Sequence, residues 1–242
     1  MSGRHITERL DALVAVVTGG SRGIGLAIAS ALVSRGARVV ITGRDQQHLD
    51  KAAQTLGAQV HAVRADVSKA DDAARAIGAA VDRFGGLDLL VNNAGVGLFA
   101  SVAEMSVAAW EQTIDTNLSG VFYCCHAAIP HLRRRGNGWI INISSLAGAN
   151  PFVGGAAYCA SKAGLNAFSE ALMQEVRYDN IRVSYIMPGS VATGFSGRGE
   201  SGVADWKVSA DDVADLVIEL VTFPSRSLPS RIELRPSRPP KK

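Results

Sequence analysis

Cysteine is scarce in this chain, which has only Cys124, Cys125 and Cys159 among its 242 residues. Their spacing matches neither a disulfide framework nor a metal-binding motif. The five histidines are spread along the chain and form no convincing ligand cluster. We therefore expect no metal site and no chemistry that depends on a disulfide.

The chain also lacks a strong charge of either sign, because 25 basic residues nearly balance 22 acidic ones and leave a net charge of +3. The segment from Arg226 onward carries six basic residues and one acidic residue, or +5, so the rest of the chain is about −2. A body of that charge has no electrostatic reason to bind nucleic acid or a membrane surface. We expect neither partner.

Long apolar runs are missing as well. No run approaches the roughly 20 residues that a helix needs to cross a bilayer. The first residues, MSGRHITERLDA, are polar and lack the apolar core of a signal peptide. We therefore expect a cytoplasmic protein.

Short apolar runs, by contrast, recur throughout and alternate with longer amphipathic stretches. The runs are rich in β-branched residues and nearly continuous, as in parallel strands that are covered on both faces. The expected strands are 13–19, 37–43, 58–66, 87–95, 138–145, 181–189 and a last short one in SRIELR, and the helices between them are 23–35, 45–56, 69–84, 108–135, 156–178 and 209–222.

This alternation predicts an α/β fold of the Rossmann type, a doubly wound domain with about seven parallel strands and helices on both faces. No linker or repeat divides the chain, so we expect a single domain over residues 1–242. Within it we expect an N-terminal extension at 1–11, a glycine-rich substrate lid at 190–208 and a basic tail at 236–242. Ligands of such sheets bind beyond the carboxyl ends of the strands.

A glycine-rich turn, TGGSRGIG, follows the first expected strand and opens the first expected helix. Its glycines are Gly19, Gly23 and Gly25, a spacing that differs from the usual G-x-G-x-x-G. Such a turn lets the backbone approach a pyrophosphate, which the helix N-terminus then stabilises. A purely structural turn is the alternative.

The second expected strand ends in Gly43 and Arg44, where an NAD site commonly has a carboxylate for the ribose 2′-hydroxyl. Arg22 lies in the glycine-rich turn as well. Two guanidinium groups suit a 2′-phosphate through charge-assisted hydrogen bonds, so we predict NADP(H) rather than NAD. The alternative is a pair of solvated surface arginines.

Four further motifs follow in order: NNAG after the fourth strand, TNLSGVF with Asn117, INISS ending at Ser145, and YCASK with Tyr158 and Lys162. Together with the glycine-rich turn, this set resembles the short-chain dehydrogenase/reductase family over residues 12–222. The spacing of four places Tyr158 and Lys162 on one face of a helix.

The resemblance implies a catalytic set of Asn117, Ser145, Tyr158 and Lys162. Tyr158 would be the acid/base, and Ser145 would hydrogen-bond the substrate oxygen. Lys162 would bind the nicotinamide ribose and lower the pKa of Tyr158, as a nearby ammonium group does. Asn117 would hold a water molecule in a proton relay from Lys162.

The resemblance also implies cofactor contacts along most of the chain. Asp66 and Val67 would contact adenine, and Thr193 would reach the nicotinamide amide or the phosphates. The full expected set of NADP(H) contacts is Gly19, Ser21, Arg22, Gly23, Ile24, Gly25, Arg44, Asp66, Val67, Asn93, Ala94, Gly95, Tyr158, Lys162, Pro188, Gly189, Val191 and Thr193.

Two functions from different classes are open at this point. The first is an NADPH-dependent oxidoreductase acting on a small carbonyl or secondary alcohol, either a 3-oxoacyl-thioester reductase or a small ketone or hydroxy-acid dehydrogenase. The second is a non-catalytic NADP(H)-binding sensor or scaffold. The family commonly pairs the helices expected at 108–135 and 156–178 between subunits, which implies a homodimer or homotetramer. Leu146, Phe152 and Val153 are candidates for an apolar substrate pocket.

Overall fold

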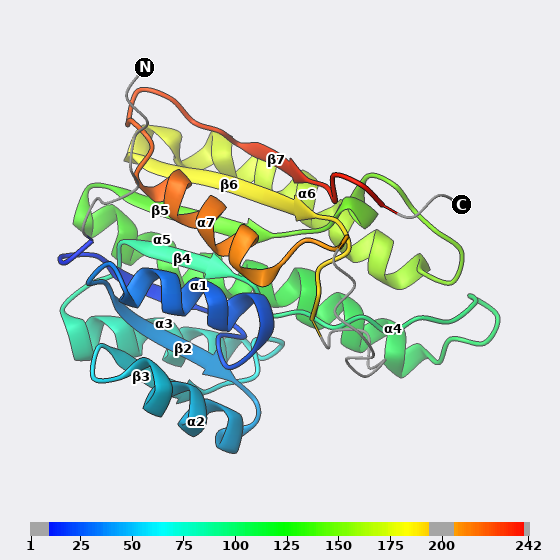
Figure 1. Ribbon diagram of the computed structural model, residues 1–242, viewed down its shortest axis with the longest axis horizontal. Helices are drawn as coiled ribbons and strands as arrows, with labels where there is room; N and C mark the ends of the chain where they lie inside the picture. The colour runs from blue at the N-terminus through cyan, green and yellow to red at the C-terminus, as the bar shows by residue number, and fades with distance from the viewer. Residues whose placement is uncertain (1–9, 194–205, 240–242) are drawn as a thin grey trace.

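In the computed structural model, which describes residues 10–193 and 206–239, seven strands form one sheet in the order β3-β2-β1-β4-β5-β6-β7 (Figure 1). Every neighbouring pair of strands is parallel. The strands are β1 (Val14–Val17), β2 (Arg38–Gly43), β3 (Val60–Arg64), β4 (Leu89–Asn92), β5 (Gly138–Ile143), β6 (Ile181–Pro188) and β7 (Arg231–Leu234). The predicted fold class is confirmed.

The strand order reverses between β1 and β4, which lie side by side at the centre of the sheet. Residues of β1, β4 and β5 are buried throughout, since helices cover both faces. Continuous burial explains why these strands are apolar at every position and not at alternate ones. The reversal opens a crevice at the carboxyl ends of β1 and β4, which is where ligands of such sheets bind.

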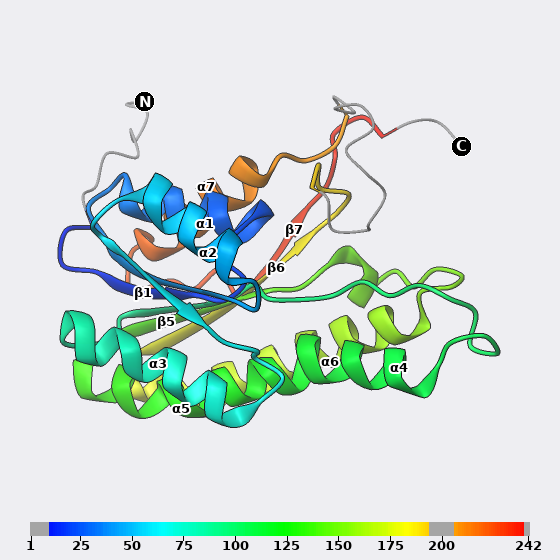
Figure 2. The same ribbon diagram turned by 90° about the horizontal axis from the view of Figure 1, so that it is seen from below.

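The helices form two layers, as Figure 2 shows from below. Helices α1 (Gly23–Val33), α2 (Gln46–Leu56) and α7 (Ala210–Val221) cover one face, where Ile28, Leu32 and Val217 join the core. The other face is covered by α3 (Ala70–Phe84), α4 (Val107–Ile114), α5 (Gly120–Arg135) and α6 (Ala156–Val176). None of the described helices combines the length and apolar character needed to span a bilayer.

The helix expected over 108–135 contains a π-helical turn, η1 (Asp115–Ser119), between α4 and α5. A π-turn inserts one extra residue into the helix and is frequent at functional sites. Asn117 lies in this turn and is fully buried. Two short 3₁₀ helices, η2 (Leu146–Gly148) and η3 (Arg177–Asp179), precede and follow α6.

Most of the predicted lid lies outside the described residues, but its two ends are described and paired. Val191 and Val208 form a parallel bridge. Ala192 N donates to Val208 O at 2.9 Å, and Val208 N donates to Ser190 O at 3.0 Å. Of the predicted extension only residues 10 and 11 are described, and of the basic tail only 236–239.

Candidate active site

The loop after β1 is fastened to the loop after β4 by hydrogen bonds between Thr18 and two residues of the NNAG motif. Thr18 Oγ1 accepts from the backbone N–H groups of Asn93 and Ala94, both at 3.0 Å. The Asn93 side-chain amide donates in return to Thr18 O at 2.9 Å and to Gly19 O at 3.2 Å. These bonds hold the glycine-rich turn at the crevice, and Thr18 is a residue that the motif analysis did not single out.

The glycines of this turn are required by its shape. Gly19 and Gly23 have φ angles of 65° and 55°, in the left-handed region that glycine adopts without strain. A Cβ atom added at Gly25 would lie 2.3 Å from Gly19 O. Arg22 is the N-cap of α1 and its side chain makes no capping hydrogen bond. A cradle of bare backbone at a helix N-terminus fits an anionic pyrophosphate.

Arg44, which follows β2, and Arg22, which lies in the glycine-rich turn, are both exposed. Gly43 lies close to this turn, because an added Cβ would be 3.2 Å from Ser21 Oγ. A carboxylate is also present, since Asp45 caps α2 by accepting from His48 N at 3.1 Å. This hydrogen bond holds the pKa of Asp45 below its usual value, and Arg22 contributes to the same shift.

The two residues predicted at the adenine differ in what their side chains do. Asp66 Oδ1 accepts from the N–H and hydroxyl of Ser68, at 3.1 and 2.8 Å. Val67 is buried against Gly120, where an added Cβ would lie 2.9 Å from Val67 O. Both residues follow β3 at the same edge of the sheet as the glycine-rich turn, and their contact with adenine stays a prediction.

Ser145, Tyr158 and Lys162 meet at the carboxyl end of β5. Ser145 is the N-cap of η2, with its Oγ accepting from Ala147 N at 3.1 Å, and its hydroxyl also forms a hydrogen bond with the Tyr158 hydroxyl. Lys162 lies one helical turn after Tyr158 in α6 and is only 4% exposed. Its Nζ donates to Ile143 O at 2.8 Å and lies 5.9 Å from the centre of the Tyr158 ring.

Burial shifts the pKa values of two residues in this cluster. Burial raises the pKa of Tyr158, and the hydrogen bond with Ser145 offsets only part of that rise. The Lys162 amino group donates to Ile143 O, and the predicted lowering of the Tyr158 pKa by Lys162 stays a prediction. Burial in turn lowers the pKa of Lys162 to about 8, so the amino group still carries its proton at pH 7.

Asn117 reaches the cluster through Ser161. The Asn117 amide donates to Val96 O at 2.9 Å and to Ser161 Oγ at 3.0 Å, and its Oδ1 accepts from Val96 N at 2.8 Å. Ser161 Oγ donates in turn to Tyr158 O at 2.8 Å. The side chain of Asn117 therefore joins the loop after β4 to the first turns of α6, a link that the motif did not reveal.

The segment after β6 closes the other side of the site. Thr193 lies beside the glycine-rich turn, since a Cβ added at Gly23 would be 3.6 Å from Thr193 Cγ2. A Cβ added at Gly189 would lie 2.9 Å from Pro236 Cδ and 3.2 Å from Leu146 Cδ1. The first residue of the predicted basic tail, Pro236, therefore lies at the rim of the site.

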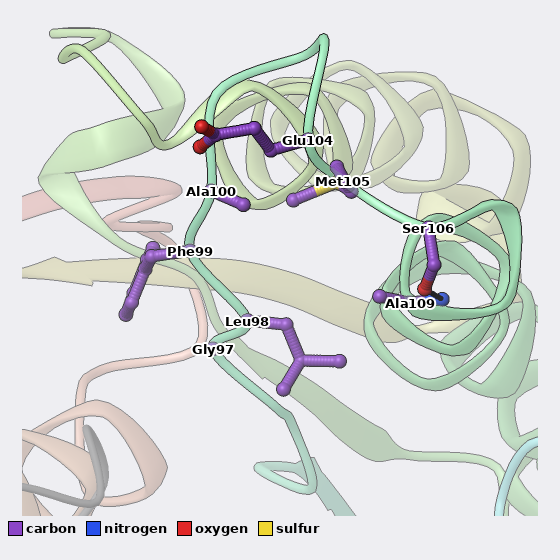
Figure 3. Close-up of a pocket in the computed structure, with 8 residues that line it drawn as sticks. All are labelled: Gly97, Leu98, Phe99, Ala100, Glu104, Met105, Ser106 and Ala109. Carbon is purple, nitrogen blue, oxygen red and sulfur yellow. Dashed lines mark hydrogen bonds between the residues drawn. The ribbon is translucent and has the colours of Figure 1, made fainter.

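Two aromatic rings stand beside Tyr158. Phe99 makes an edge-on contact with the Tyr158 ring at 5.6 Å, and Phe152 lies 5.8 Å from Phe99. Figure 3 shows Phe99 pointing away from a pocket of about 490 Å³ into which Leu98 and Met105 project. Phe152 was a candidate pocket residue from the sequence; Phe99 was missed because it lies in a loop without periodicity.

The sheet order, the glycine-rich turn at its reversal and the cluster at the same edge define a Rossmann-type α/β protein. The sequence model of the short chain dehydrogenase family matches residues 13–202, and the chain belongs to that family. The predictions of the family and of its enzyme class, an oxidoreductase, are confirmed.

Similar proteins cover nearly the whole chain. An uncharacterized oxidoreductase of Staphylococcus epidermidis is 36% identical over 226 residues, which are 92% of this chain and 96% of the relative. One of Staphylococcus saprophyticus is 35% identical over 227 residues, with 92% and 97% covered.

Two solved structures are also similar. A metagenomic short-chain oxidoreductase in complex with NADP has 39% identity and a TM-score of 0.83, with 95% of this chain and 99% of the other covered. An alcohol dehydrogenase from the archaeon Thermococcus sibiricus, complexed with 5-hydroxy-NADP, has 30% identity and a TM-score of 0.87, again with 95% and 99% covered.

Proposed function

We propose that this protein is an NADPH-dependent carbonyl reductase that also works in reverse as a secondary-alcohol dehydrogenase. The observation that supports it best is the hydrogen bond between the Ser145 and Tyr158 hydroxyls, with the buried Lys162 one turn away. All three side chains lie at the carboxyl edge of the sheet, beside the glycine-rich turn. A non-catalytic sensor would not need this set.

In the proposed reaction, Tyr158 donates its phenolic proton to the carbonyl oxygen. A tyrosine is protonated at neutral pH, and the protonated phenol is the form that acts as an acid. Ser145 donates a hydrogen bond to the same oxygen as negative charge develops on it. Lys162 contributes a buried positive charge, and Asn117 holds α6 in register through Ser161. The nicotinamide, when bound, supplies or accepts the hydride.

For the cofactor we propose NADP(H), because Arg44 follows β2 directly and Arg22, at the N-cap of α1, is close enough to the start of α2 to act on Asp45. Two guanidinium groups near the expected adenosine ribose suit a 2′-phosphate. The bare backbone around Gly19 and Gly25 would take the pyrophosphate. Thr193, next to Gly23, is placed to reach the phosphates or the nicotinamide amide. Both similar solved structures contain NADP or a derivative of it, which supports the same choice.

The finer alternatives are a 3-oxoacyl-thioester reductase and a small ketone or hydroxy-acid dehydrogenase. The likeness to an alcohol dehydrogenase favours the second. We also propose that the protein forms a homodimer or homotetramer, because Trp110 on α4 and Phe122 on α5 leave 43% and 49% of their surface exposed. The cytoplasm is the proposed location, as the sequence predicts. Light scattering on the purified protein measures the assembly, and a monomer would contradict it.

The decisive experiment replaces Tyr158 with Phe. We expect Tyr158→Phe to lower kcat for ketone reduction by about 10²- to 10⁴-fold, the usual range for a general acid. NADPH binding, followed by nicotinamide fluorescence, should persist. Tyr185→Phe is the matched control, because Tyr185 is a buried tyrosine that bonds Glu170 away from the site. Turnover that survives Tyr158→Phe, or no NADPH oxidation by the wild type with any ketone, would contradict the proposal.

A further inference from the structure

Phe99 presents aromatic surface beside the Tyr158 ring, and Phe152 extends that surface through its contact with Phe99. Their side chains are 45% and 48% exposed, so each ring keeps surface free for a contact. Phe99 meets the Tyr158 ring edge-on, with an angle of 72° between the planes, and Phe152 is tilted by 52° against Phe99. The exposed ring surface is therefore continuous with the catalytic tyrosine and is not a separate patch.

Both rings are held in place by backbone features. Ala100 N, next to Phe99, donates to Gly154 O at 3.0 Å and so joins the loop after β4 to the loop before α6. A Cβ atom at Gly155 would lie 2.6 Å from atoms of the Phe152 ring. Only glycine lets that ring lie over the start of α6. The two rings form a preorganised wall, which lowers the entropic cost of binding a flat apolar group.

The same two loops carry almost no charge. Residues 93–106 contain one charged side chain, Glu104, and residues 144–157 contain none. Glu104 lines the pocket next to Phe99 and bonds Ser101 at 3.0 Å. The cation nearest Tyr158 in α6, Lys162, is buried and bonded to Ile143 O. An anionic substrate therefore finds an acidic group and no accessible partner in these loops.

We infer that the substrate is a neutral ketone with an aryl group next to the carbonyl, and that Phe99 and Phe152 bind this ring while Tyr158 and Ser145 bind the oxygen. This inference rests on the proposed function and narrows it to one substrate class. Aromatic rings prefer edge-on and offset contacts of the kind that Phe99 already makes with Tyr158.

The test measures kcat/KM with NADPH for four ketones: acetophenone, butan-2-one, 4-methylacetophenone and 4-acetylbenzoate. We expect acetophenone to exceed butan-2-one by about tenfold or more, since one well-packed aromatic contact accounts for that factor. The neutral 4-methylacetophenone should exceed the anionic 4-acetylbenzoate.

Phe99→Ala and Phe152→Ala should each lower kcat/KM for acetophenone about five- to tenfold and change that for butan-2-one by less than about twofold. Phe99→Leu should retain part of the aryl preference, because leucine keeps the apolar surface. Tyr178→Ala removes an aromatic ring that is 92% exposed in η3, at the other end of α6, and should leave the preference unchanged.

The outcomes separate this inference from the proposed function. Reduction of butan-2-one without an aryl preference, or an aryl preference that survives both alanine variants, overturns the inference and leaves the proposed reductase intact. Failure to reduce any of the four ketones, in protein that binds NADPH, overturns both. Thermal melts of the variants establish that they are folded before their kinetics are compared.

Discussion

Ser161 Oγ lies 3.0 Å from Asn117 Nδ2, which ties the π-helical turn η1 to α6 inside the core. Both residues are fully buried, and Ser161 passes the connection on to Tyr158 O at 2.8 Å. Through this pair, Tyr158 is linked to a residue 41 positions earlier in the chain. We infer that the pair positions Tyr158, because the Asn117 amide is used in its bonds to Val96 O and Ser161 Oγ.

We expect Ser161→Ala to lower kcat by about 3- to 10-fold with little change in KM for the cofactor, because a small displacement of the acid weakens catalysis without removing it. The free energy of unfolding should fall by about 1–2 kcal/mol, the cost of a lost buried hydrogen bond. Steady-state kinetics and urea unfolding measure the two effects.

Ser169→Ala is the matched control for that variant. Ser169 is equally buried in α6 and bonds Asn142 Nδ2 at 2.8 Å, further along the helix from Tyr158. It should lose a similar amount of stability and keep its kcat. An equal loss of kcat in both variants would show that the effect on catalysis is general destabilisation.

The buried Lys162 should make stability depend on pH. Its pKa is about 8 in the folded chain, against 10.5 for an ordinary lysine. Below pH 8 the side chain is protonated in both states, and the folded state bears the full cost of burying the charge. Between pH 8 and 10.5 the unfolded state binds more protons, so stability rises with pH across that window.

Relative to Lys162→Met, the wild type should therefore gain about 2 kcal/mol of unfolding free energy between pH 7 and pH 9.5. Urea unfolding of both proteins at the two pH values measures this difference, and other titrating groups cancel in the comparison. If the difference in unfolding free energy between the wild type and Lys162→Met stays constant or falls as the pH rises, the folded chain does not lower the pKa of Lys162.

Gly25→Ala should remove NADPH binding and destabilise the protein. The added Cβ would lie 2.3 Å from Gly19 O and 2.5 Å from Asn93 Nδ2, so the turn and its link to the loop after β4 must shift. We expect a loss of about 2 kcal/mol or more, typical of overpacking against backbone. Thermal melts and cofactor titration measure both effects.

Gly78→Ala is also a glycine-to-alanine substitution, but we expect it to stabilise the protein. Gly78 lies within α3, and an added Cβ would meet nothing within 4 Å. Alanine is favoured over glycine in a helix by about 1 kcal/mol, so this variant should be more stable and bind NADPH normally. Destabilisation by Gly78→Ala would contradict the described packing of α3.

Arg44→Ala should weaken NADPH binding by about tenfold and leave NADH binding nearly unchanged, because a charge-assisted contact to the 2′-phosphate is lost. Adding Gly43→Asp should shift the preference further toward NADH, although the new side chain must displace the Ser21 hydroxyl slightly. The ratio of kcat/KM for the two cofactors is the measurement. Arg134→Ala, an exposed arginine near the end of α5, is the control. A wild-type preference for NADH would refute the choice of NADP(H).

The strands and most helices could be predicted from the sequence. Strands β1, β4 and β5 are buried on both faces, so their sequences are continuous apolar runs. The π-turn at Asp115–Ser119 could not be predicted, because no residue type in this stretch marks a π-turn within a helix. Because the turn was not predicted, neither the burial of Asn117 nor its hydrogen bond to Ser161 could be predicted from the sequence.

The spacing of Tyr158 and Lys162 could also be predicted from the sequence, but the direction in which the Lys162 amino group points could not. A period of four places two side chains on one face, whereas the bond from Lys162 to Ile143 O depends on how α6 packs against β5. The contact of Phe99 with Tyr158 could not be predicted for a related reason. A loop has no period, so only the folded chain shows that this ring lies against Tyr158.

The bridge between Val191 and Val208 affects which changes of length the chain can accept between these two residues. Because these residues are paired, the chain between them starts and ends at one fixed point next to the site, and β6 and α7 keep their positions whatever its length. The entropic cost of lengthening a closed loop grows only slowly, by about 0.6 kcal/mol per doubling. We therefore expect insertions, deletions or grafted segments between Val191 and Val208 to leave unaltered the fold that carries Ser145, Tyr158 and Lys162.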